Sequence, residues 1–450
     1  MELRNIYFIG IGGIGMSALA RYYKFKGYEV SGYDRTPSDL TAQLEEEGIA
    51  VHYTDDVSFI PKDTESTLVV WTPAIPDDMG ELAYVRGHGY RLVKRSKMLG
   101  EITRGQQCLA VAGTHGKTTT STLLAHILTE SGEGCSAFLG GISRNYGTNM
   151  LVSHTPTVVA EADEFDRSFL QLFPSIAVIT AVDPDHLDIY GDYAHVVEAF
   201  REFASQVSGT LVAKKGIPVG AEHTKASILT YHYTDTGADF HPERARTDET
   251  GHVIYDLRHP GGVLREIRVG APGWVNAENS VAAAAVAMTY GIDHEAIRHA
   301  IGTFRGVKRR LEVHVEKPGL IYIDDYAHHP AELASAISSI REMYPGRKLT
   351  AIFQPHLYTR TRDFAEDFAR SLSAVDKLLL LDIYPAREEP IPGVTSEIIF
   401  KGVTAPEKVL IRKEDLMDCL KGEDIQVLVT FGAGNIDRFT EPITKLLGQR

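Results

Sequence analysis

Two glycine-rich turns, each between an apolar strand and a helix, are the features of this sequence best suited to chemistry. The first reads GIGGIG at residues 10–15, and the second reads GTHGKT at residues 113–118. Glycines allow the backbone to approach a phosphate closely, and the following helix directs free N–H groups and its positive dipole end at the anion. Both turns therefore predict phosphate binding.

The first turn is typical of dinucleotide-binding folds. Asp34 follows the second predicted strand, roughly 20 residues after the turn, where an acid in such folds meets a ribose hydroxyl. The turn accepts any dinucleotide-like pyrophosphate and does not specify nicotinamide, and packing of helix against strand is an alternative role for its glycines. The predicted contacts are Gly10, Gly12, Gly13, Gly15 and Asp34.

The second turn is typical of nucleoside triphosphate sites. It ends in the Gly-Lys-Thr of a P-loop, although two residues separate its glycines where the usual pattern has four. Lys117 supplies a positive charge, and the hydroxyl of Thr118 is suited to Mg²⁺. A lysine at a helix N-terminus opposes the helix dipole, which disfavours a purely structural role. The predicted ATP contacts here are Gly113, Thr114, His115, Gly116, Lys117, Thr118 and Thr119.

Acidic side chains follow two apolar strands after the second turn. These two clusters comprise Glu161, Asp163, Glu164 and Asp166, and Asp183, Asp185, His186 and Asp188. Ligands bind at the carboxyl ends of strands in open parallel sheets, and Mg²⁺ prefers oxygen ligands beside phosphate. A subset of these groups therefore suits a metal, while a solvated loop or a helix cap is the alternative for any single one.

Three further segments concentrate histidine and arginine. Residues 323–332 contain a His-His pair, residues 353–364 contain His356, Arg360 and Arg362, and residues 308–310 read KRR. The arginine fork suits carboxylate or phosphate. From residue types alone, the histidines equally suit a solvent-facing loop. The KRR run suits either a hinge that faces nucleotide phosphates or a solvated charge run.

Apolar strands alternate with helical segments along the chain, which predicts α/β architecture with parallel sheets covered on both faces. The alternation restarts at strand 107–112 and again near residue 314, and residues 215–272 fit it poorly. We predict three successive α/β domains: a Rossmann-like domain (1–106), a P-loop-type ATP-binding domain (107–313) and a Rossmann-like domain (314–450).

Composition excludes several classes of function. The 450-residue chain has a net charge of −14 and no long basic run, which disfavours a nucleic-acid partner. No apolar run approaches the roughly 20 residues of a membrane span, and the start MELRNIYF does not resemble a secretory signal. The three cysteines lie far apart, which favours a reducing compartment over a disulfide framework. We therefore expect a cytoplasmic protein.

The order of these motifs resembles that of the Mur ligases of peptidoglycan synthesis, over essentially the whole chain. The motifs are GIGGIGMSALA, GTHGKTTT, EADEFDRSFL, DPDHLDIY, NAENSVAAAA, DDYAHHPAE, FQPHLYTRT, EEPIPG and FGAGNID. The resemblance implies that the first turn holds the pyrophosphate of UDP-N-acetylmuramate and the second holds ATP. It implies transfer of a phosphoryl group to the lactyl carboxylate, followed by attack of the L-alanine amine on the acyl phosphate.

Two alternatives accompany this interpretation. Within the family, the ligase that recycles murein tripeptide shares the P-loop and the DDYxHHP motif, but GIGGIGMSALA favours the alanine-adding enzyme. Outside the family, a nicotinamide-dependent oxidoreductase would use the first turn and leave Lys117 without a role. A simple nucleotide-driven switch would leave the first turn unexplained.

The resemblance also implies roles for particular residues. The implied metal ligands are Thr118, Glu161 and His186. The implied nucleotide contacts beyond the P-loop are Asn276, Asn279, Arg310, Asp325 and Tyr326. The implied contacts to the muramyl substrate and alanine are His328, His356 and Arg360. Lys117, His186, Arg310 and His328 are the implied catalytic residues. The chain departs from the family pattern at Val275, where histidine is common, and at Leu357, where arginine is common.

Overall fold

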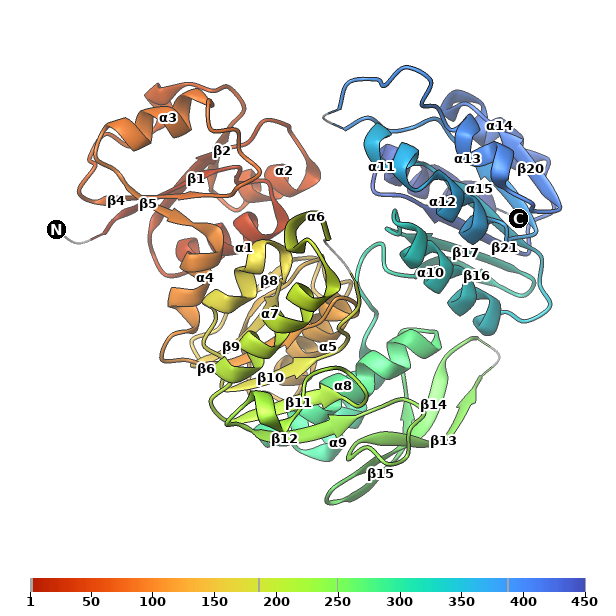
Figure 1. Ribbon diagram of the computed structural model, residues 1–450, viewed down its shortest axis with the longest axis horizontal. Coiled ribbons are helices and arrows are strands. Elements are labelled where there is room, and N and C mark those ends of the chain that lie inside the picture. The colour runs from red at the N-terminus through yellow and green to blue at the C-terminus, as the bar shows by residue number, and fades with distance from the viewer. Residues whose placement is uncertain (1–2, 185–186, 249, 387, 450) are drawn as a thin grey trace. The chain divides into compact units, whose positions relative to one another are not determined.

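The computed structural model describes residues 3–184, 187–248, 250–386 and 388–449 (Figure 1). The chain divides into two compact units. The first comprises Met1–Arg246, Val253–Ala271 and Val275–Gly306, and the second comprises Thr247–His252, Pro272–Trp274 and Val307–Arg450. Three of the four sheets are mainly parallel and carry helices, which confirms the predicted fold class. The predicted domain boundaries stay a prediction.

The first sheet is parallel and has the strand order β3-β2-β1-β4-β5. Its strands are β1 (Asn5–Ile9), β2 (Glu29–Tyr33), β3 (Ala50–His52), β4 (Thr67–Trp71) and β5 (Arg91–Lys94), and its helices are α1 (Ile14–Phe25), α2 (Asp39–Glu46), α3 (Gly80–Gly87) and α4 (Arg95–Thr103). Strand β1 pairs with β2 on one side and with β4 on the other. The first glycine turn therefore lies where the strand order reverses, which is where open α/β sheets bind ligands.

The second sheet has the order β12-β11-β10-β6-β9-β7-β8 and is parallel except for β8. Its strands are β6 (Gln107–Ala112), β7 (Ser136–Phe138), β8 (Met150–Leu151), β9 (Thr157–Ala162), β10 (Ile176–Ile179), β11 (Thr210–Lys214) and β12 (Ser227–Tyr231); its helices are α5 (Lys117–Glu130), α6 (Leu187–Tyr190), α7 (Tyr193–Gln206), α8 (Trp274–Tyr290) and α9 (His294–Thr303). Because β6 lies between β9 and β10, the second glycine turn is flanked by the ends of both strands.

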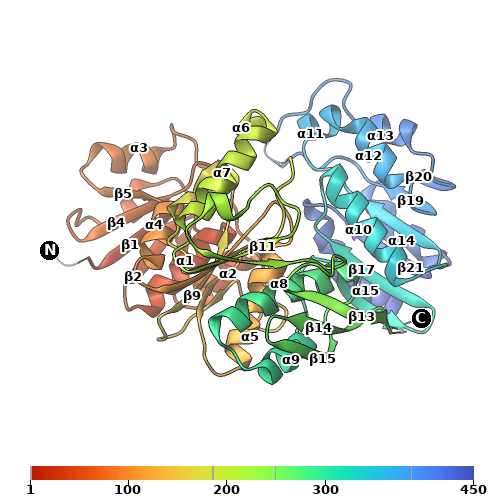
Figure 2. The ribbon, with the colours of Figure 1, turned by 60° about the horizontal axis from the view of Figure 1, so that its bottom comes forward.

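The segment that fits the alternation poorly forms a separate antiparallel sheet. Its strands are β13 (His241–Thr247), β14 (Val253–His259) and β15 (Gly262–Arg268), and α9 packs against β15 (Figure 2). Strand β12, near the start of the segment 215–272, instead belongs to the parallel second sheet, and the sequence predicted no strand arrangement for this segment. The connection between β14 and β15 has two residues, which suffices for a hairpin but not for the crossover that parallel strands need.

The second unit contains a six-stranded sheet in the order β16-β17-β21-β18-β19-β20. Its strands are β16 (Glu312–Lys317), β17 (Leu320–Asp325), β18 (Leu349–Phe353), β19 (Lys377–Leu380), β20 (Glu407–Leu410) and β21 (Val427–Phe431); its helices are α10 (Pro330–Met343), α11 (Tyr358–Asp363), α12 (Ala365–Leu372), α13 (Glu397–Gly402), α14 (Leu416–Lys421) and α15 (Thr440–Gly448). Strand β16 is antiparallel to β17. Helices α11 and α12 follow each other directly and are divided at Phe364.

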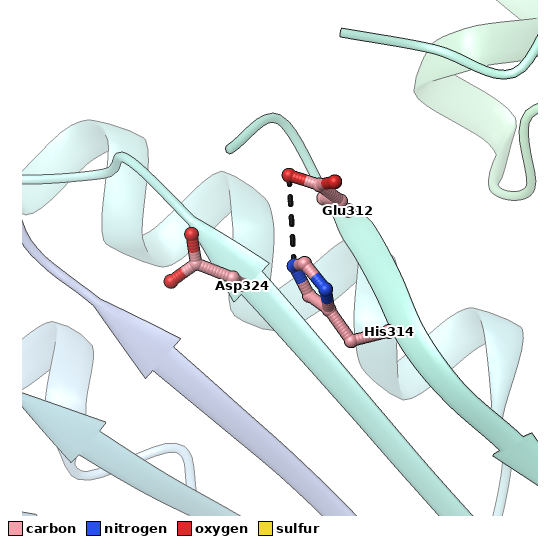
Figure 3. Close-up of side chains that lie close together, drawn as sticks. All are labelled: Glu312, His314 and Asp324. Carbon is pink, nitrogen blue, oxygen red and sulfur yellow. Dashed lines mark ion pairs between the residues drawn. The ribbon is translucent and has the colours of Figure 1, made fainter. Parts of the chain in front are cut away.

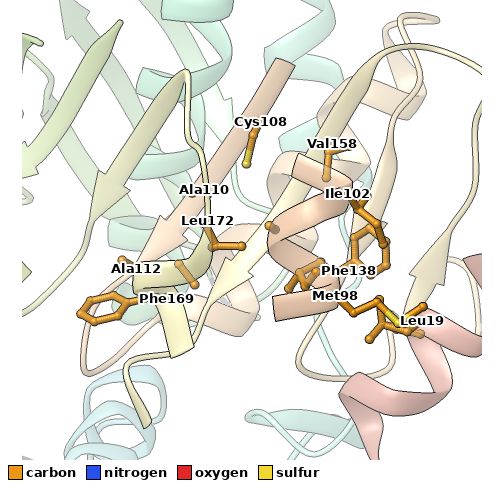
Figure 4. Packing of buried hydrophobic residues seen from close by; sticks show 14 of the residues in the cluster. Leu19, Met98, Ile102, Cys108, Ala110, Ala112, Phe138, Val158, Phe169 and Leu172 are labelled. Atoms are coloured by element: carbon orange, nitrogen blue, oxygen red, sulfur yellow. The ribbon is translucent and has the colours of Figure 1, made fainter. Parts of the chain in front are cut away.

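The first two sheets share one apolar core. On α4, Met98 and Ile102 belong to the same buried cluster as Leu19 of α1 and Phe138 of β7 (Figure 4). Helix α4 therefore packs against elements of both sheets. Among the helices that the structure describes, none is long and apolar enough to cross a membrane.

Candidate functional site

The second glycine turn is held in a conformation that requires glycine at two positions. Gly113 has φ +136° and Gly116 has φ +82°, both in the region that side chains rarely adopt. A Cβ atom on Gly116 would lie 2.6 Å from Oδ1 of Asn279. The hydroxyl of Thr180, just after β10, donates to the carbonyls of Ala112 (3.1 Å) and His115. The turn is therefore fixed between the end of β10 and helix α8.

Lys117 projects from the start of α5 into a buried, acidic setting. Its ammonium donates to the Gly113 carbonyl (2.7 Å) and to Oε1 of Glu164 (2.8 Å), and the Glu164 side chain is 1% exposed. Burial by itself would lower the pKa of Lys117. The negative charges of Glu164 and, to a lesser extent, of Glu161 and Asp163 outweigh this effect and raise the pKa of Lys117. Lys117 therefore remains a cation at neutral pH, and Glu164 is its counter-ion.

Thr118 and Glu161 lie together, as the sequence predicted for a metal site. The Thr118 hydroxyl donates to Oε1 of Glu161 (2.9 Å), and Oε2 accepts from Ser121 (3.2 Å) and from the Gly140 amide (2.8 Å). A Cβ atom on Gly140 would collide with the Glu161 carboxylate. Strand register places Glu161 beside Val111, two residues before the turn. A hydroxyl and a carboxylate beside a P-loop form an oxygen donor set that fits Mg²⁺.

The other acids of the two clusters have different positions. His186 and Asp185 lie outside the described residues. Asp183 accepts from the Thr114 hydroxyl at 3.4 Å and pairs with His115 at 3.8 Å. Asp163 pairs with Arg95 at 3.5 Å. Within the part of the chain that the structure describes, Glu161 is the acid that contacts Thr118.

Helix α8 brings the two predicted asparagines to the same region. Asn276 and Asn279 are 8% and 6% exposed. Oδ1 of Asn279 accepts from the Thr120 hydroxyl of α5 at 3.3 Å, one turn into the helix that the P-loop opens. The first turns of α8 therefore lie beside the P-loop, and the Asn279 side chain packs against Gly116.

The first glycine turn contacts its predicted acid directly. The Gly12 amide donates to Oδ2 of Asp34 at 2.7 Å, and Oδ1 accepts from the Thr36 amide at 3.1 Å. A Cβ atom on Gly12 would lie 2.8 Å from Oδ2 of Asp34. The N-cap residue of α1 is Gly13, which has no side chain that could accept hydrogen bonds from the first amides of the helix. The structure thus brings the predicted pyrophosphate and ribose contacts together at the end of β1.

The second unit gathers its predicted residues around the loops that follow β17 and β18. The carboxylate of Asp325 accepts from the amides of Leu311 (2.7 Å) and Ala327 (2.8 Å). Burial raises the pKa of Asp325 to about 6, against the opposing charge of Arg310. The guanidinium of Arg310 lies 5.7 Å from the ring centre of Tyr326. Asp325, Tyr326 and Arg310 therefore form one cluster.

His328 and His356 extend this cluster. Their ring centres are 6.0 Å apart, and Nη1 of Arg360 lies 3.4 Å from Nδ1 of His356. Burial lowers the pKa of His328 although Glu332 partly opposes this shift, so His328 is neutral at neutral pH. Leu357, one of the departures from the family pattern, has φ +72° at the start of α11. The three predicted substrate contacts in this unit are thus neighbours.

The second unit contains a further cluster of acidic and histidine side chains whose possible ligand atoms lie close enough together to hold a metal ion. Glu312, His314 and Asp324 lie close together on β16 and β17, with the His314 ring directed at Glu312 (Figure 3). However, Nε of Arg309 lies 2.9 Å from Asp324, and the Arg309 amide donates to Glu312 at 2.7 Å. Because the guanidinium already pairs with Asp324 and the Arg309 amide already binds Glu312, we interpret the group as a structural network of polar contacts. Arg309 and Arg310 of the KRR run both lie beside the Tyr326 ring, at 5.2 and 5.7 Å, and Arg309 also belongs to this network.

Comparisons with known proteins agree with the geometry. Three Mur ligase family models match successive parts of the chain: the Mur ligase family catalytic domain (residues 5–107), the Mur ligase middle domain (111–287) and the Mur ligase glutamate ligase domain (309–434). Curated relatives named UDP-N-acetylmuramate–L-alanine ligase include one from Parabacteroides distasonis. It is 51% identical, and the alignment covers 99% of this chain and 98% of the relative. A relative of the same name from Porphyromonas gingivalis is 50% identical over 99% of each chain.

Solved structures give the same result. The UDP-N-acetylmuramate–alanine ligase of Thermotoga maritima superposes with a TM-score of 0.84 at 25% identity, covering 99% of this chain and all of that one. A murein peptide ligase from Psychrobacter arcticus shares the fold, with a TM-score of 0.69 at 22% identity and 99% coverage of each chain. From the ordered motifs, the family models and the full-length relatives together, the chain belongs to the Mur ligase family.

Proposed function

We infer that this protein is the ATP-dependent ligase that joins L-alanine to the lactyl carboxylate of UDP-N-acetylmuramate, an early step in making the peptidoglycan precursor. The observation that carries this inference is Lys117, a buried ammonium in the P-loop beside Thr118 and Glu161, in the same unit as a second anion-binding turn. Relatives that carry this name are about half identical over nearly the whole chain.

The reaction needs activation because a carboxylate repels an attacking amine. A lactyl carboxylate oxygen attacks the γ-phosphorus of ATP, the bond from that phosphorus to the bridging oxygen breaks, and ADP leaves. The amine of L-alanine then attacks the acyl carbon, the carbon–oxygen bond to phosphate breaks, and inorganic phosphate and a proton are released. Phosphoryl transfer depends mainly on positioning and charge neutralisation. Lys117 and the amides of residues 113–119 supply both at the β- and γ-phosphates.

We propose that Thr118 and Glu161 hold Mg²⁺, with His186 as a further ligand. A bound Mg²⁺ neutralises phosphate charge and orients the phosphates for in-line attack. Glu161 is suited to this task because its carboxylate is oriented by Ser121 and by the Gly140 amide while it faces Thr118.

For the remaining predicted residues we propose binding roles. In the first unit, Gly10, Gly12, Gly13, Gly15 and Asp34 bind the UDP moiety, and Asn276 and Asn279 bind on the adenine side. In the second unit, Arg310, Asp325 and Tyr326 bind nucleotide, and His328, His356 and Arg360 bind the muramyl substrate and alanine. The mutual proximity of the second-unit residues supports a common role. Because the reaction consumes ATP, we place the enzyme in the cytoplasm.

Both alternatives have less support. A nicotinamide-dependent oxidoreductase would leave Lys117, Thr118 and Glu161 unused. Among solved structures, the murein peptide ligase of Psychrobacter arcticus superposes with a TM-score of 0.69 and the alanine ligase of Thermotoga maritima with 0.84, and the full-length relative that is 51% identical carries the alanine ligase name.

The test is phosphate release by the full chain with ATP, Mg²⁺, UDP-N-acetylmuramate and L-alanine, omitting each component in turn. We expect release only when all four are present. Release with a murein tripeptide in place of L-alanine, or release that needs neither substrate, would refute the assignment.

A further inference from the structure

Arg95 lies against the first glycine turn although it is far from that turn in the sequence. It is the first residue of α4, and a Cβ atom on Gly15 would lie 2.8 Å from its Nη1 and 3.2 Å from its Cδ. Because Gly15 has no side chain, the Arg95 side chain can occupy the space beside it. Any side chain at residue 15 would displace the guanidinium.

Helix α4 holds Arg95 in this place through tight packing. Met98 and Ile102 are 2% and 7% exposed within the core that includes Leu19 of α1 (Figure 4). Gly100 lies so close to the Gln171 carbonyl that a Cβ atom there would collide with it. Close contact on two sides leaves α4 little freedom to shift, so the position of Arg95 is set by the fold.

The charge around Arg95 leaves it able to bind an anion. Its Nη2 is 3.5 Å from Oδ2 of Asp163, which is longer than a hydrogen bond. Across the described ranges, the guanidinium has no other ion pair and makes no hydrogen bond, and its side chain is 24% exposed. The first turn itself contains no basic residue between Gly10 and Gly15. Arg95 is therefore a cation from elsewhere in the chain that lies in contact with this turn.

We propose that Arg95 binds the pyrophosphate of the UDP substrate at the first glycine turn and that Asp163 is a positioning residue for Arg95. This proposal rests on the proposed function. The planar guanidinium fork matches two phosphate oxygens, and turn amides at the start of α1 bind the same anion from the other side. Asp163 is two residues after Glu161, so this contact also links the UDP site to the end of β9, the strand that carries the proposed metal ligand.

The test is calorimetric binding of three nucleotides to the full-length protein. UDP and UDP-N-acetylglucosamine contain the pyrophosphate but lack the lactyl carboxylate that UDP-N-acetylmuramate carries. We expect Arg95→Ala to weaken all three by a similar factor, on the order of 10- to 100-fold, as for loss of a charge-assisted contact. Arg95→Lys should recover part of the loss, and ATP affinity should stay within about twofold.

Lys97→Ala is the matched control, because it removes one positive charge from an exposed position on the same helix. It should leave all three affinities within about twofold. Asp163→Asn should weaken UDP binding by a few-fold in the wild-type background and have no effect in the Arg95→Ala background, because Asp163 acts through Arg95.

Each other outcome has a distinct meaning. Unchanged nucleotide affinity in both Arg95 variants overturns the proposal. A loss confined to UDP-N-acetylmuramate also overturns it, and assigns Arg95 to the lactyl carboxylate. If Arg95→Ala melts earlier than wild type, the better tolerated Arg95→Lys decides the case. Failure of the wild-type protein to bind any of the three nucleotides would instead refute the proposed function.

Discussion

The two glycine turns of the first unit differ in the origin of their positive charge. The second turn contains its own cation, because Lys117 directly follows Gly116. The first turn has none, and a guanidinium in contact with it belongs to Arg95 on α4, some 80 residues farther along the chain. A self-contained site is visible as a sequence motif. A site that takes a residue from a distant helix becomes visible only in the folded chain.

Both turns contain glycines with positive φ, Gly10 (+89°) in the first turn and Gly113 and Gly116 in the second, but the glycines that directly precede the two helices differ in backbone strain. Gly113 and Gly116 have positive φ and close neighbours, so the fold of the second turn itself requires glycine. Gly13 in the first turn has φ −64°, and a Cβ atom on it would have its nearest neighbour 3.5 Å away. Glycine at residue 13 is therefore not needed for the fold. Close approach of a ligand is the remaining physical reason for it.

The variant with the largest expected effect removes Lys117, the cation that belongs to the second turn itself. Lys117→Ala should lower the rate of phosphate release on the order of a thousandfold, because a positioned charge at the transferring phosphate is lost. Affinity for UDP-N-acetylmuramate should stay close to that of wild type, since the first turn does not use Lys117. Lys97→Ala is the control for removal of a positive charge. A Lys117→Ala enzyme that keeps a tenth of the wild-type rate would contradict the ATP-loop assignment.

Glu161→Gln tests the metal role that distinguishes the second turn from the first. The rate should fall about 100-fold, and the Mg²⁺ concentration for half-maximal rate should rise, because the amide keeps the shape and loses the charge. Binding of UDP should not change. The measurement is a Mg²⁺ titration of activity beside a thermal melt, with Glu202→Gln on the exposed side of α7 as the control. An unchanged Mg²⁺ dependence would assign Glu161 to structure alone.

A matched pair of glycine variants tests the difference in strain. Gly116→Ala should cost about 1–3 kcal/mol of folding free energy, because alanine disfavours φ +82° and its methyl group would meet Asn279. Gly13→Ala should cost less than about 1 kcal/mol and weaken UDP binding about tenfold, because the methyl group would stand where phosphate approaches. Chemical denaturation and calorimetry measure the two quantities. Equal destabilisation by both variants would show that the backbone at Gly13 requires glycine as strictly as the backbone at Gly116.

The smallest effect concerns the strands that lead into the turns. In β1, Tyr7 donates to the buried carboxyl of Glu81 at 2.6 Å, and His52 lies 2.7 Å from the same hydroxyl. Burial, with lesser contributions from Asp55 and Asp56, raises the pKa of Glu81 to about 7, although hydrogen bonds oppose the shift. Glu81 itself lies on α3, and strand β6 contains no tyrosine that could donate to a buried carboxyl as Tyr7 of β1 does.

This raised pKa predicts a pH dependence of stability for the first region. A carboxyl whose pKa is higher in the folded chain stabilises it fully below its unfolded pKa, near 4.5, and the contribution is lost as pH rises through about 7. The loss should be about 1–2 kcal/mol between pH 5.5 and 8.5, and Glu81→Gln should reduce it. Burial lowers the pKa of His52, which acts in the opposite direction on the acid side. Melts of both proteins that change in parallel across this range would contradict the prediction.

Several features of the site could be predicted from the sequence because they depend on neighbouring residues. The P-loop with Lys117 and Thr118, and the glycine turn at the end of β1, are local patterns of strand, turn and helix. By residue type Glu161 was one of eight candidate groups, and only the family resemblance favoured it; the register of β9 against β6 places it next to Val111 and its carboxylate accepts from Thr118. The sequence alone could not distinguish it, because every acid of the two clusters follows an apolar strand.

The sequence by itself determined the α/β class, the order of the motifs and the two phosphate-binding turns, because the periodicity of apolar residues and the glycine spacing act over short stretches of chain. Only the tertiary structure decided that Glu164 pairs with Lys117, that Arg309 neutralises Asp324, and that Arg95 lies beside Gly15. These contacts join residues 15 to 80 positions apart, so they depend on how the sheets and helices pack. No local pattern of residue types encodes that packing.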